Sequence, residues 1–203
     1  MSVKSSQADR SEATRALLVG TAERLFTARG YSGTATEDIV AAAGVTRGAL
    51  YHHFKDKKDL FRAVFVAIEE RMVANLAGLA MGADDAWTVV IAGVRAFLDA
   101  CLEPAVQRIA LIEAPAVLGW SEWREIDERY ALGLVRMSLE TAMEAGEIEQ
   151  QPLDPLAHVL LGALTEAALL IARADDTEAA RRTVGNTVER LISSLRVPQA
   201  ATK

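Results

Sequence analysis

Apolar residues recur at every third or fourth position through most of this chain, which is the spacing that places them on one face of an α-helix. The first apolar face consists of Leu18, Ala22, Leu25 and Phe26. Glycine commonly follows the last turn of a helix. The pattern therefore predicts a helix that begins near Ser11 and ends at Gly30.

The same period continues to the C-terminus. A long helix is expected from Lys57 to about residue 79, with an apolar face made of Leu60, Phe61, Val64 and Ile68. Further helical segments are expected at 87–101, 105–118 (with a break at Pro115), 123–145, 154–172 (capped by Asp154) and 177–196. The segment 154–172 is apolar on nearly all sides, so it must be covered on both faces. The chain is predicted to be all-α, with about nine helices.

Residues 30–54 have the pattern of two short helices joined by a tight turn, the outline of a helix-turn-helix. Thr34 and Glu37 have the three-residue spacing of a capping box, which predicts that the first short helix begins near Ala35. Gly44 can adopt the left-handed conformation that ends a helix.

The second short helix is expected to present one face to DNA. Thr46 is placed to cap it, and Leu50 and Phe54, one turn apart, are expected to face the core. The opposite face carries Arg47, Gly48, Tyr51 and His52. This face would enter a major groove.

The run GYSGTATEDIVAAAGVTRGALYHHFKDKKDLF, residues 30–61, resembles the DNA-binding domain of the TetR family of bacterial transcriptional regulators. The matching positions are Gly30, Tyr31, Ile39, Ala43, Gly44, Val45, Gly48, Leu50, Tyr51, Phe54, Lys57 and Leu60. The motifs APAVLGW at 114–120 and LLGAL…EAALLIA across 160–172 are similar to the helical regulatory half of one TetR branch. The resemblance implies a three-helix DNA-binding domain at 11–56 and a larger ligand-binding and dimerisation domain at 57–197.

The resemblance also implies DNA contacts, with bases for Arg47 and Gly48 and with phosphates for Thr46, Tyr51 and Lys57. Glu37 departs from the pattern, because some members have a basic, base-reading residue at this position and a carboxylate repels phosphate. The capping role accounts for Glu37. Base reading is therefore expected to rest on Arg47 and His52.

Charge is distributed unevenly along the chain. Residues 1–60 hold nine Lys or Arg and seven Asp or Glu, a net charge of +2, whereas the whole chain has a net charge of −6. An acidic protein can still bind DNA where its basic groups share one surface, because phosphate neutralisation is local.

The single cysteine, Cys101, excludes an intrachain disulfide, so a reducing compartment fits. The N-terminus lacks the apolar core of a secretory signal, and no uninterrupted apolar run approaches the length needed to span a bilayer. We expect a soluble, cytoplasmic protein without a membrane partner.

Enzymatic and metal-binding chemistry are poorly supported by the sequence. His52 and His53 are adjacent, so on a helix they point about 100° apart and are poorly placed to chelate one ion. Cys101 lies in an apolar stripe and is interpreted as core filler. No nucleophile, base and orienting group have motif spacing. We expect no enzyme activity, no metal site and no cofactor.

An effector site is expected among the helices of the C-terminal part, near Phe97, Trp120, Trp123, Tyr130 and Met137. The two tryptophans either flank a pocket or seal a helix junction. Glu166 lies amid apolar residues, where a buried carboxylate is costly unless it is paired. It is expected to pair with Arg108 or Arg136, or to meet a polar group of the ligand.

Gly162 and Gly185 fall inside predicted helices, where glycine costs about 1 kcal/mol relative to alanine, and close helix crossing is a common compensation. In the resembling family the last two helices of each subunit form a four-helix dimer interface. The corresponding candidates here are Gly162, Ala163, Val188 and Leu191.

The sequence is most consistent with a TetR-like, homodimeric repressor that a small apolar or amphipathic molecule releases from a palindromic operator in double-stranded DNA. One alternative is a dimeric DNA-binding regulator with a filled core and no effector, such as an activator or an architectural factor. Another is a helical carrier or enzyme that keeps a vestigial DNA-binding segment. A pocket in the helical body would separate the first reading from the second.

Overall fold

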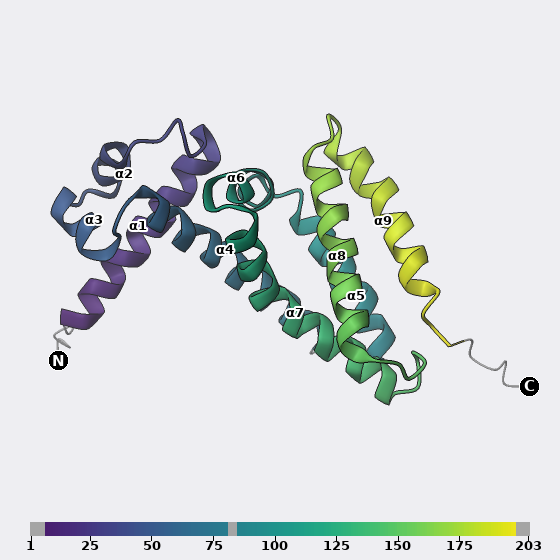
Figure 1. The fold of residues 1–203 in the computed structure, drawn as a ribbon. Helices are drawn as coiled ribbons and strands as arrows, with labels where there is room; N and C mark the ends of the chain where they lie inside the picture. Colours follow the sequence, from purple (N-terminus) through teal and green to yellow (C-terminus); the bar gives the residue numbers. More distant parts are fainter. Residues whose placement is uncertain (1–6, 81–84, 198–203) are drawn as a thin grey trace, which may run out of the picture.

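The computed structural model describes residues 7–80 and 85–197. Within these ranges the chain folds into nine α-helices and one π-helical segment, without a β-strand (Figure 1), as the all-α prediction requires. The elements are α1 (Gln7–Arg29), α2 (Thr36–Ala43), α3 (Arg47–His53), α4 (Lys57–Ala80), α5 (Ala86–Ala100), η1 (Val106–Glu113), α6 (Ala114–Leu118), α7 (Trp120–Glu144), α8 (Leu153–Ala172) and α9 (Thr177–Ser193).

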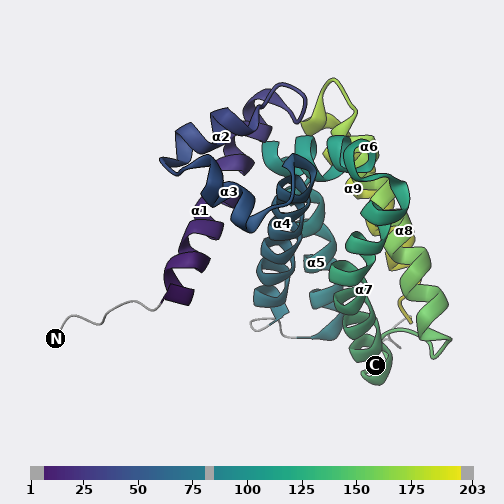
Figure 2. The ribbon, with the colours of Figure 1, turned by 60° about the vertical axis from the view of Figure 1, so that its left-hand side comes forward.

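Helices α1, α2 and α3 form one group, and the remaining helices form a larger body (Figure 1). The long helix α4 connects the two, since it packs on α1 and also on η1, α5, α6 and α7. Helices α8 and α9 pack on each other at the side of the body away from α1–α3 (Figure 1), and α5 and α7 lie between them and α4 (Figure 2).

Most of the predicted apolar faces are buried. Leu18, Ala22 and Phe26 of α1 are fully buried, and so are all four residues of the predicted α4 face. Helix α1 begins at Gln7, four residues before the predicted start, and ends at Gly30 with φ +77°.

Two predicted features of the later helices are wrong. Asp154 does not cap α8, because Pro152 occupies the capping position and Asp154 lies in the first turn, where its carboxylate pairs with Arg136. Pro115 does not interrupt a helix. It lies in the first turn of α6, where no amide donor is required, and it follows the π-helical segment η1.

Helix α8 is long and apolar enough to cross a membrane by length and composition alone, although Asp154, His158 and Glu166 interrupt its apolar run. Here it packs against α5, α7, α9 and η1, and half of its most apolar stretch is buried. The rest of the chain covers only part of it, since Val159 and Leu170 point outward with 71% and 54% exposure.

Candidate functional site

Helix α2 begins differently from the prediction. Thr34 and Glu37 form no capping box, because the Thr34 side chain is buried and its hydroxyl donates to the Gly30 carbonyl oxygen at 2.8 Å. The Ala35 amide instead donates to the Asp38 carboxylate at 3.2 Å. The helix therefore starts at Thr36, with the carboxylate that supports its first turn one residue later than expected.

The turn between α2 and α3 matches the prediction. Gly44 has the left-handed conformation, φ 65° and ψ 30°, and the Thr46 hydroxyl accepts a hydrogen bond from the Ala49 amide at 3.2 Å. Leu50 and Phe54 are buried, at 0% and 3% exposure. The short helix α3 is thus held from both its start and its inner face.

The outward face of α3 carries the four residues predicted for it, Arg47, Gly48, Tyr51 and His52, all exposed. The Arg47 guanidinium lies 5.5 Å from the centre of the Tyr51 ring and 3.4 Å from a carboxylate oxygen of Glu37. Hydrogen bonds from the Glu37 amide and from Thr36, together with the charge of Arg47, lower the pKa of Glu37. Glu37 is therefore a counter-charge to Arg47, a role that its assignment to the capping box concealed.

Lys57 connects the start of α4 to the segment between α1 and α2. Its ammonium donates hydrogen bonds to the carbonyl oxygens of Tyr31 and Thr34, at 2.9 and 3.0 Å, and lies 4.2 Å from the centre of the Tyr31 ring. An ammonium has three N–H donors, so these bonds leave one for another acceptor. Lys57 thus positions the helix-turn-helix in addition to any role at DNA.

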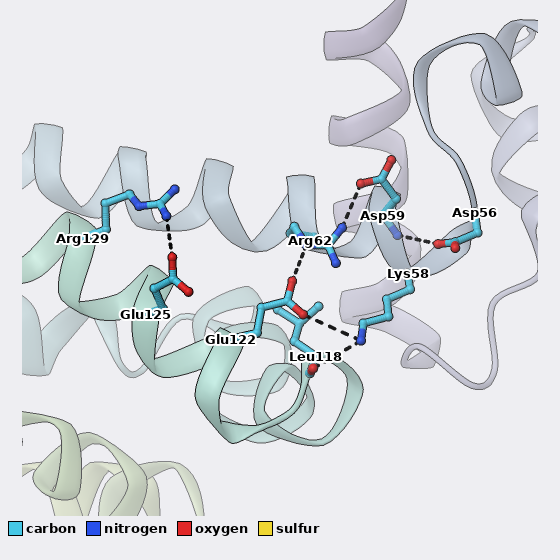
Figure 3. A network of polar contacts seen from close by, with 8 residues as sticks. All are labelled: Asp56, Lys58, Asp59, Arg62, Leu118, Glu122, Glu125 and Arg129. Atoms are coloured by element: carbon cyan, nitrogen blue, oxygen red, sulfur yellow. Dashed lines mark hydrogen bonds and ion pairs between the residues drawn. The ribbon is translucent and has the colours of Figure 1, made fainter.

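A polar network joins α4 to the start of α7 (Figure 3). The Glu122 carboxylate pairs with Arg62 and lies 3.7 Å from the Lys58 ammonium. Lys58 also donates to the Leu118 carbonyl oxygen at 3.2 Å, and Arg62 pairs with Asp59 at 2.9 Å. The N-terminal turns of α4 are therefore tied to α6 and α7.

A second junction joins the π-helical segment to the end of α1. The Glu113 carboxylate accepts a hydrogen bond from the Tyr31 amide at 2.8 Å. Arg108 donates to the carbonyl oxygens of Thr27 and Ala28, at 3.1 and 3.2 Å. Gly30 permits this approach, because a Cβ there would lie 2.6 Å from a Glu113 oxygen. We call the contacts of Arg108 and Glu113 with residues 27–31 the η1 clamp.

The body contains a partly open cavity of about 110 Å³ among α4, α5, η1, α7 and α8. Phe97, Trp123 and Met137 lie on its wall, as expected of effector-site residues. Trp123 is fully buried, and its indole N–H donates to the Ala110 carbonyl oxygen at 2.9 Å, which fixes α7 against η1.

The other three candidates, Trp120, Tyr130 and Glu166, lie outside the cavity wall. Trp120 is 59% exposed and packs on Trp123 with ring centres 4.8 Å apart. The Tyr130 hydroxyl donates a hydrogen bond to the exposed Glu70 carboxylate at 3.3 Å.

The prediction that Glu166 is buried is wrong, because its side chain is exposed. The arginines considered as its partners are bound elsewhere, Arg108 in the η1 clamp and Arg136 with Asp154. The residue falls on the outer face of α8, which the nearly uniform apolar pattern of that helix did not reveal.

The cavity wall carries two carboxyl groups that the sequence reasoning missed, Glu69 from α4 and Asp127 from α7. Glu69 is 7% exposed, and it forms no hydrogen bond or ion pair with any residue of 7–80 or 85–197. Burial, and secondarily the charge of Asp127, raises the pKa of Glu69 to about 8.

Asp127, unlike Glu69, has a charged partner for its carboxylate. Its carboxylate lies 3.2 Å from the Arg124 guanidinium, which also bonds the Thr165 hydroxyl at 3.3 Å. Burial raises the pKa of Asp127 to about 6, and the charge of Arg124 opposes that rise. Helical spacing contains a signal for Glu69, since it follows buried Phe65 by four residues, but its exposed neighbour Glu70 masks that signal.

The outer face of α8 and α9 has exposed apolar side chains, among them Val159, Leu170 and Leu191. Ala163 is exposed, and a Cβ added at Gly162 would meet no atom within 4 Å. The predicted crossing at Gly162 is therefore not made within this chain.

Two other residues of these helices face inward. Val188, predicted for a dimer interface, is 6% exposed and packs in the chain's own core. Gly185 is also buried, and a Cβ there would approach Arg181 and Leu98. Gly185 therefore serves the packing of α9 on α5.

Comparison with known proteins places both parts of the chain. Residues 18–64 match the family model described as "Bacterial regulatory proteins, tetR family", and residues 87–195 match the model described as "Tetracyclin repressor-like, C-terminal domain". The crystal structure of a TetR-family transcriptional regulator from Pectobacterium atrosepticum is 35% identical, with a TM-score of 0.85. The match covers 95% of this chain and 98% of that one.

Curated relatives agree with this assignment. The Transposon Tn10 TetC protein of Escherichia coli is 27% identical over 164 residues, which are 80% of this chain and 82% of that protein. The HTH-type transcriptional regulator AcrR of Shigella flexneri is 45% identical over 62 residues, 30% of this chain and 29% of AcrR. Regulators of this family bind operator DNA and act as dimers. Given its helix-turn-helix, its helical body and these matches, the chain belongs to the TetR family of DNA-binding transcriptional regulators.

Proposed function

We propose that this protein is a homodimeric repressor that leaves a palindromic operator when a small apolar or amphipathic effector enters the body cavity. One observation carries the proposal. The helical elements that line the cavity, α4, η1 and α7, are the same elements that hold the DNA-binding part through Lys57, the Glu122 network and the η1 clamp.

The DNA contacts follow from the outward face of α3. Arg47 and His52 read base edges in the major groove, Gly48 lets the helix approach closely, and Thr46 and Tyr51 contact phosphates. Lys57 uses its remaining N–H for a phosphate while it holds the segment between α1 and α2. The corresponding division of the chain is 11–56 for DNA binding and 57–197 for effector binding and dimerisation.

Induction follows from the shared elements. A ligand that fills the cavity separates α4 from η1 or α7, and the displacement reaches residues 27–31 and Lys57 because both junctions are made of directed hydrogen bonds. The two DNA-binding parts of a dimer then no longer match the spacing of two half-sites. By linkage, such a ligand binds the DNA-bound form more weakly by the same factor.

The dimer forms through the outer faces of α8 and α9. The exposed apolar residues of these faces and the open space at Gly162 support this assignment. Val188 is buried within its own chain and is therefore not assigned to the interface, whereas Gly162, Ala163 and Leu191 are. Ala163→Glu would place a charge at the centre of the contact and is expected to give folded monomers in sedimentation without operator affinity. An undisturbed dimer would place the interface elsewhere.

A cytoplasmic location fits this function, with no membrane partner and no cofactor. The competing possibility of a regulator with a filled core and no effector is less well supported, because the body contains a cavity with an unpaired buried carboxyl group. The third possibility, a carrier or enzyme with a vestigial DNA-binding segment, would require turnover without DNA affinity.

The proposal is tested by selecting fragments of the protein's own genome that the full-length protein retains and sequencing them. Specific retention of a near-palindrome is expected, with the centres of its half-sites one DNA turn or a multiple of it apart. Retention of fragments without a shared sequence would contradict a specific regulator. Release of the selected operator by small molecules then tests induction separately from DNA binding.

A further inference from the structure

The cavity wall combines a mostly apolar surface with acidic groups only. Its aromatic and thioether side chains are those of Phe97, Trp123, Met72 and Met137. Its ionisable side chains are Glu69, Asp127 and Cys101, and the described wall contains no lysine, arginine or histidine. An anionic ligand would therefore meet carboxyl groups and no cationic side chain on the cavity wall, which is costly in a buried environment.

The charges around the cavity do not balance. Arg124 pairs with Asp127 and is shared with the carboxylate of Glu128, at 3.2 and 2.9 Å. Arg181, whose charge acts on Cys101, is already paired with Asp99. Glu69 faces Asp127 from α4 and has no hydrogen-bond or ion-pair partner among the residues that the structure describes. One additional positive charge placed between Glu69 and Asp127 would supply the missing counter-ion.

From these observations we infer that the effector is a small organic cation, whose protonated amine lies between Glu69 and Asp127 and whose hydrocarbon part fills the apolar cavity. The inference rests on the proposed effector site and specifies its ligand class. Ring faces attract a cation, so Phe97 and Trp123 suit this ligand as well. The cavity also limits the size of the ligand. A cavity of ~150 Å³ accommodates benzene, and this one has about 110 Å³, so a small ligand is expected.

The carboxyl pair links ligand binding to helix position. Glu69 lies on α4 and Asp127 on α7, so an ammonium between them bridges the two helices that the Glu122 network also connects nearer to the DNA-binding part. Binding of a cation favours the ionised form of Glu69. Below the pKa of Glu69, the ligand therefore displaces a proton from that group, and its affinity rises with pH.

Three other ionisable groups lie near Glu69, and their pKa values decide which of them contributes to this pH dependence. Asp127 and Tyr130 face it from α7, and Cys101 faces it from the end of α5. Burial raises the pKa of the Cys101 thiol to about 12, and burial also raises the pKa of the Tyr130 hydroxyl, so both remain protonated at neutral pH. Asp127, with a pKa of about 6, is the lower of the two acids, and Glu69 titrates above it.

Cyclopentylamine and cyclopentanol are suitable probes, because they have the same ring and differ in charge. Calorimetry on the full-length protein without DNA is expected to show tighter binding of the amine by about tenfold to a hundredfold, the range for a hydrogen bond to a charged group. Glu69→Gln is expected to abolish this preference and to leave the alcohol affinity within about threefold. Glu70→Gln, at the exposed neighbouring carboxylate, is the matched control and should keep the preference.

Between pH 6 and pH 8 the amine affinity is expected to rise by up to about tenfold per pH unit, the limit for displacement of one proton, while the alcohol affinity stays flat. Equal binding of amine and alcohol, or an unchanged preference in a folded Glu69→Gln protein, would overturn the inference. If Glu69→Gln fails to fold, Asp127→Asn provides the same comparison. A neutral compound that releases the operator where amines do not bind would also overturn it, yet would leave the proposed repressor function standing.

Discussion

The start and the middle of α4 show how differently this protein treats charged side chains. Near its start, Lys57, Lys58 and Arg62 each have defined partners, namely two carbonyl oxygens for Lys57 and the Glu122 network for the other two (Figure 3). Three turns later Glu69 is more deeply buried than any of them and has no partner among the described residues. The charges at the start of α4 are paired within the protein itself, whereas under the proposed function Glu69 gains its partner from a ligand.

This difference indicates where stability and response are located. A charged side chain that is hydrogen-bonded to a second helix fixes the relative position of the two helices. Removing one member of such a pair is destabilising, because the other member is left desolvated and unpaired. An unpaired buried carboxyl group instead lowers stability at pH values where it ionises. The DNA-binding part is therefore expected to be held rigidly on α4, and the cavity is expected to be the part of the molecule that a ligand changes most.

The largest expected effect is that of Trp123→Ala. The side chain is 1% exposed and links α7 to η1, so its removal is expected to lower the free energy of unfolding by about 3–5 kcal/mol. Trp120→Ala is the matched control, because Trp120 is 59% exposed and should cost much less. Urea denaturation of both proteins measures the difference. Equal losses would mean that the two stacked rings act as one unit and that the cavity wall does not depend on Trp123.

Glu69 provides the second test through pH. Its pKa is raised from 4.5 to about 8, so the native state binds its proton more tightly than the unfolded state does. The free energy of unfolding is therefore expected to fall as pH rises through this window, by up to about 1.4 kcal/mol per pH unit. Asp127 contributes in the same direction below its pKa of about 6.

Glu69→Gln should remove the fall between pH 6 and pH 8, and Glu70→Gln should retain it. Denaturation at several pH values makes this comparison. A slope that persists in the Glu69→Gln protein would show that another group is responsible, and it would remove the contrast between the start and the middle of α4.

The sequence predicted the DNA-binding part better than the body for a physical reason. In α2 and α3 the decisive signals are local: Gly44 needs the left-handed conformation and Thr46 caps the helix that follows it. Even there, the capping box failed, because the Thr34 hydroxyl can bond either to the helix ahead of it or to the one behind it. Local spacing does not decide between these partners.

In the body, the site depends on which helix faces which. The contribution of Phe97 and Trp123 could be anticipated from their apolar stripes, but Glu69 could not be separated from Glu70 by composition. Similarly, Glu166 was expected inside because α8 is apolar all around, and the outward orientation of its face follows from how α5, α7 and α9 pack on the helix. Which face of a helix is buried depends on tertiary contacts, and these cannot be read from a single sequence.

The next prediction concerns the DNA-binding part and tests the role of Arg47 in base reading. Its guanidinium is exposed and faces outward from α3, so Arg47→Ala is expected to lose about 1–3 kcal/mol of discrimination at one operator base pair. Lys57→Ala is expected to weaken all DNA sequences alike and to lower the salt slope by about one. Binding titrations with the operator and with random DNA distinguish these outcomes. A uniform loss in Arg47→Ala would assign base reading to other residues of the same face.

The smallest expected effect concerns Glu37, the counter-charge to Arg47. In free solution the two exposed side chains pair at 3.4 Å, and this contact must be exchanged for contacts with DNA when the helix enters the groove. Glu37→Gln removes both the competing partner and the repulsion between a carboxylate and phosphate. Operator and random DNA are therefore expected to bind about two- to fivefold more tightly, within the range for an exposed ion pair. The gain should shrink at high salt, since exposed charges are screened. A loss of affinity confined to the operator would instead show that Glu37 orients Arg47 for base reading, which would make the pair a part of the recognition surface.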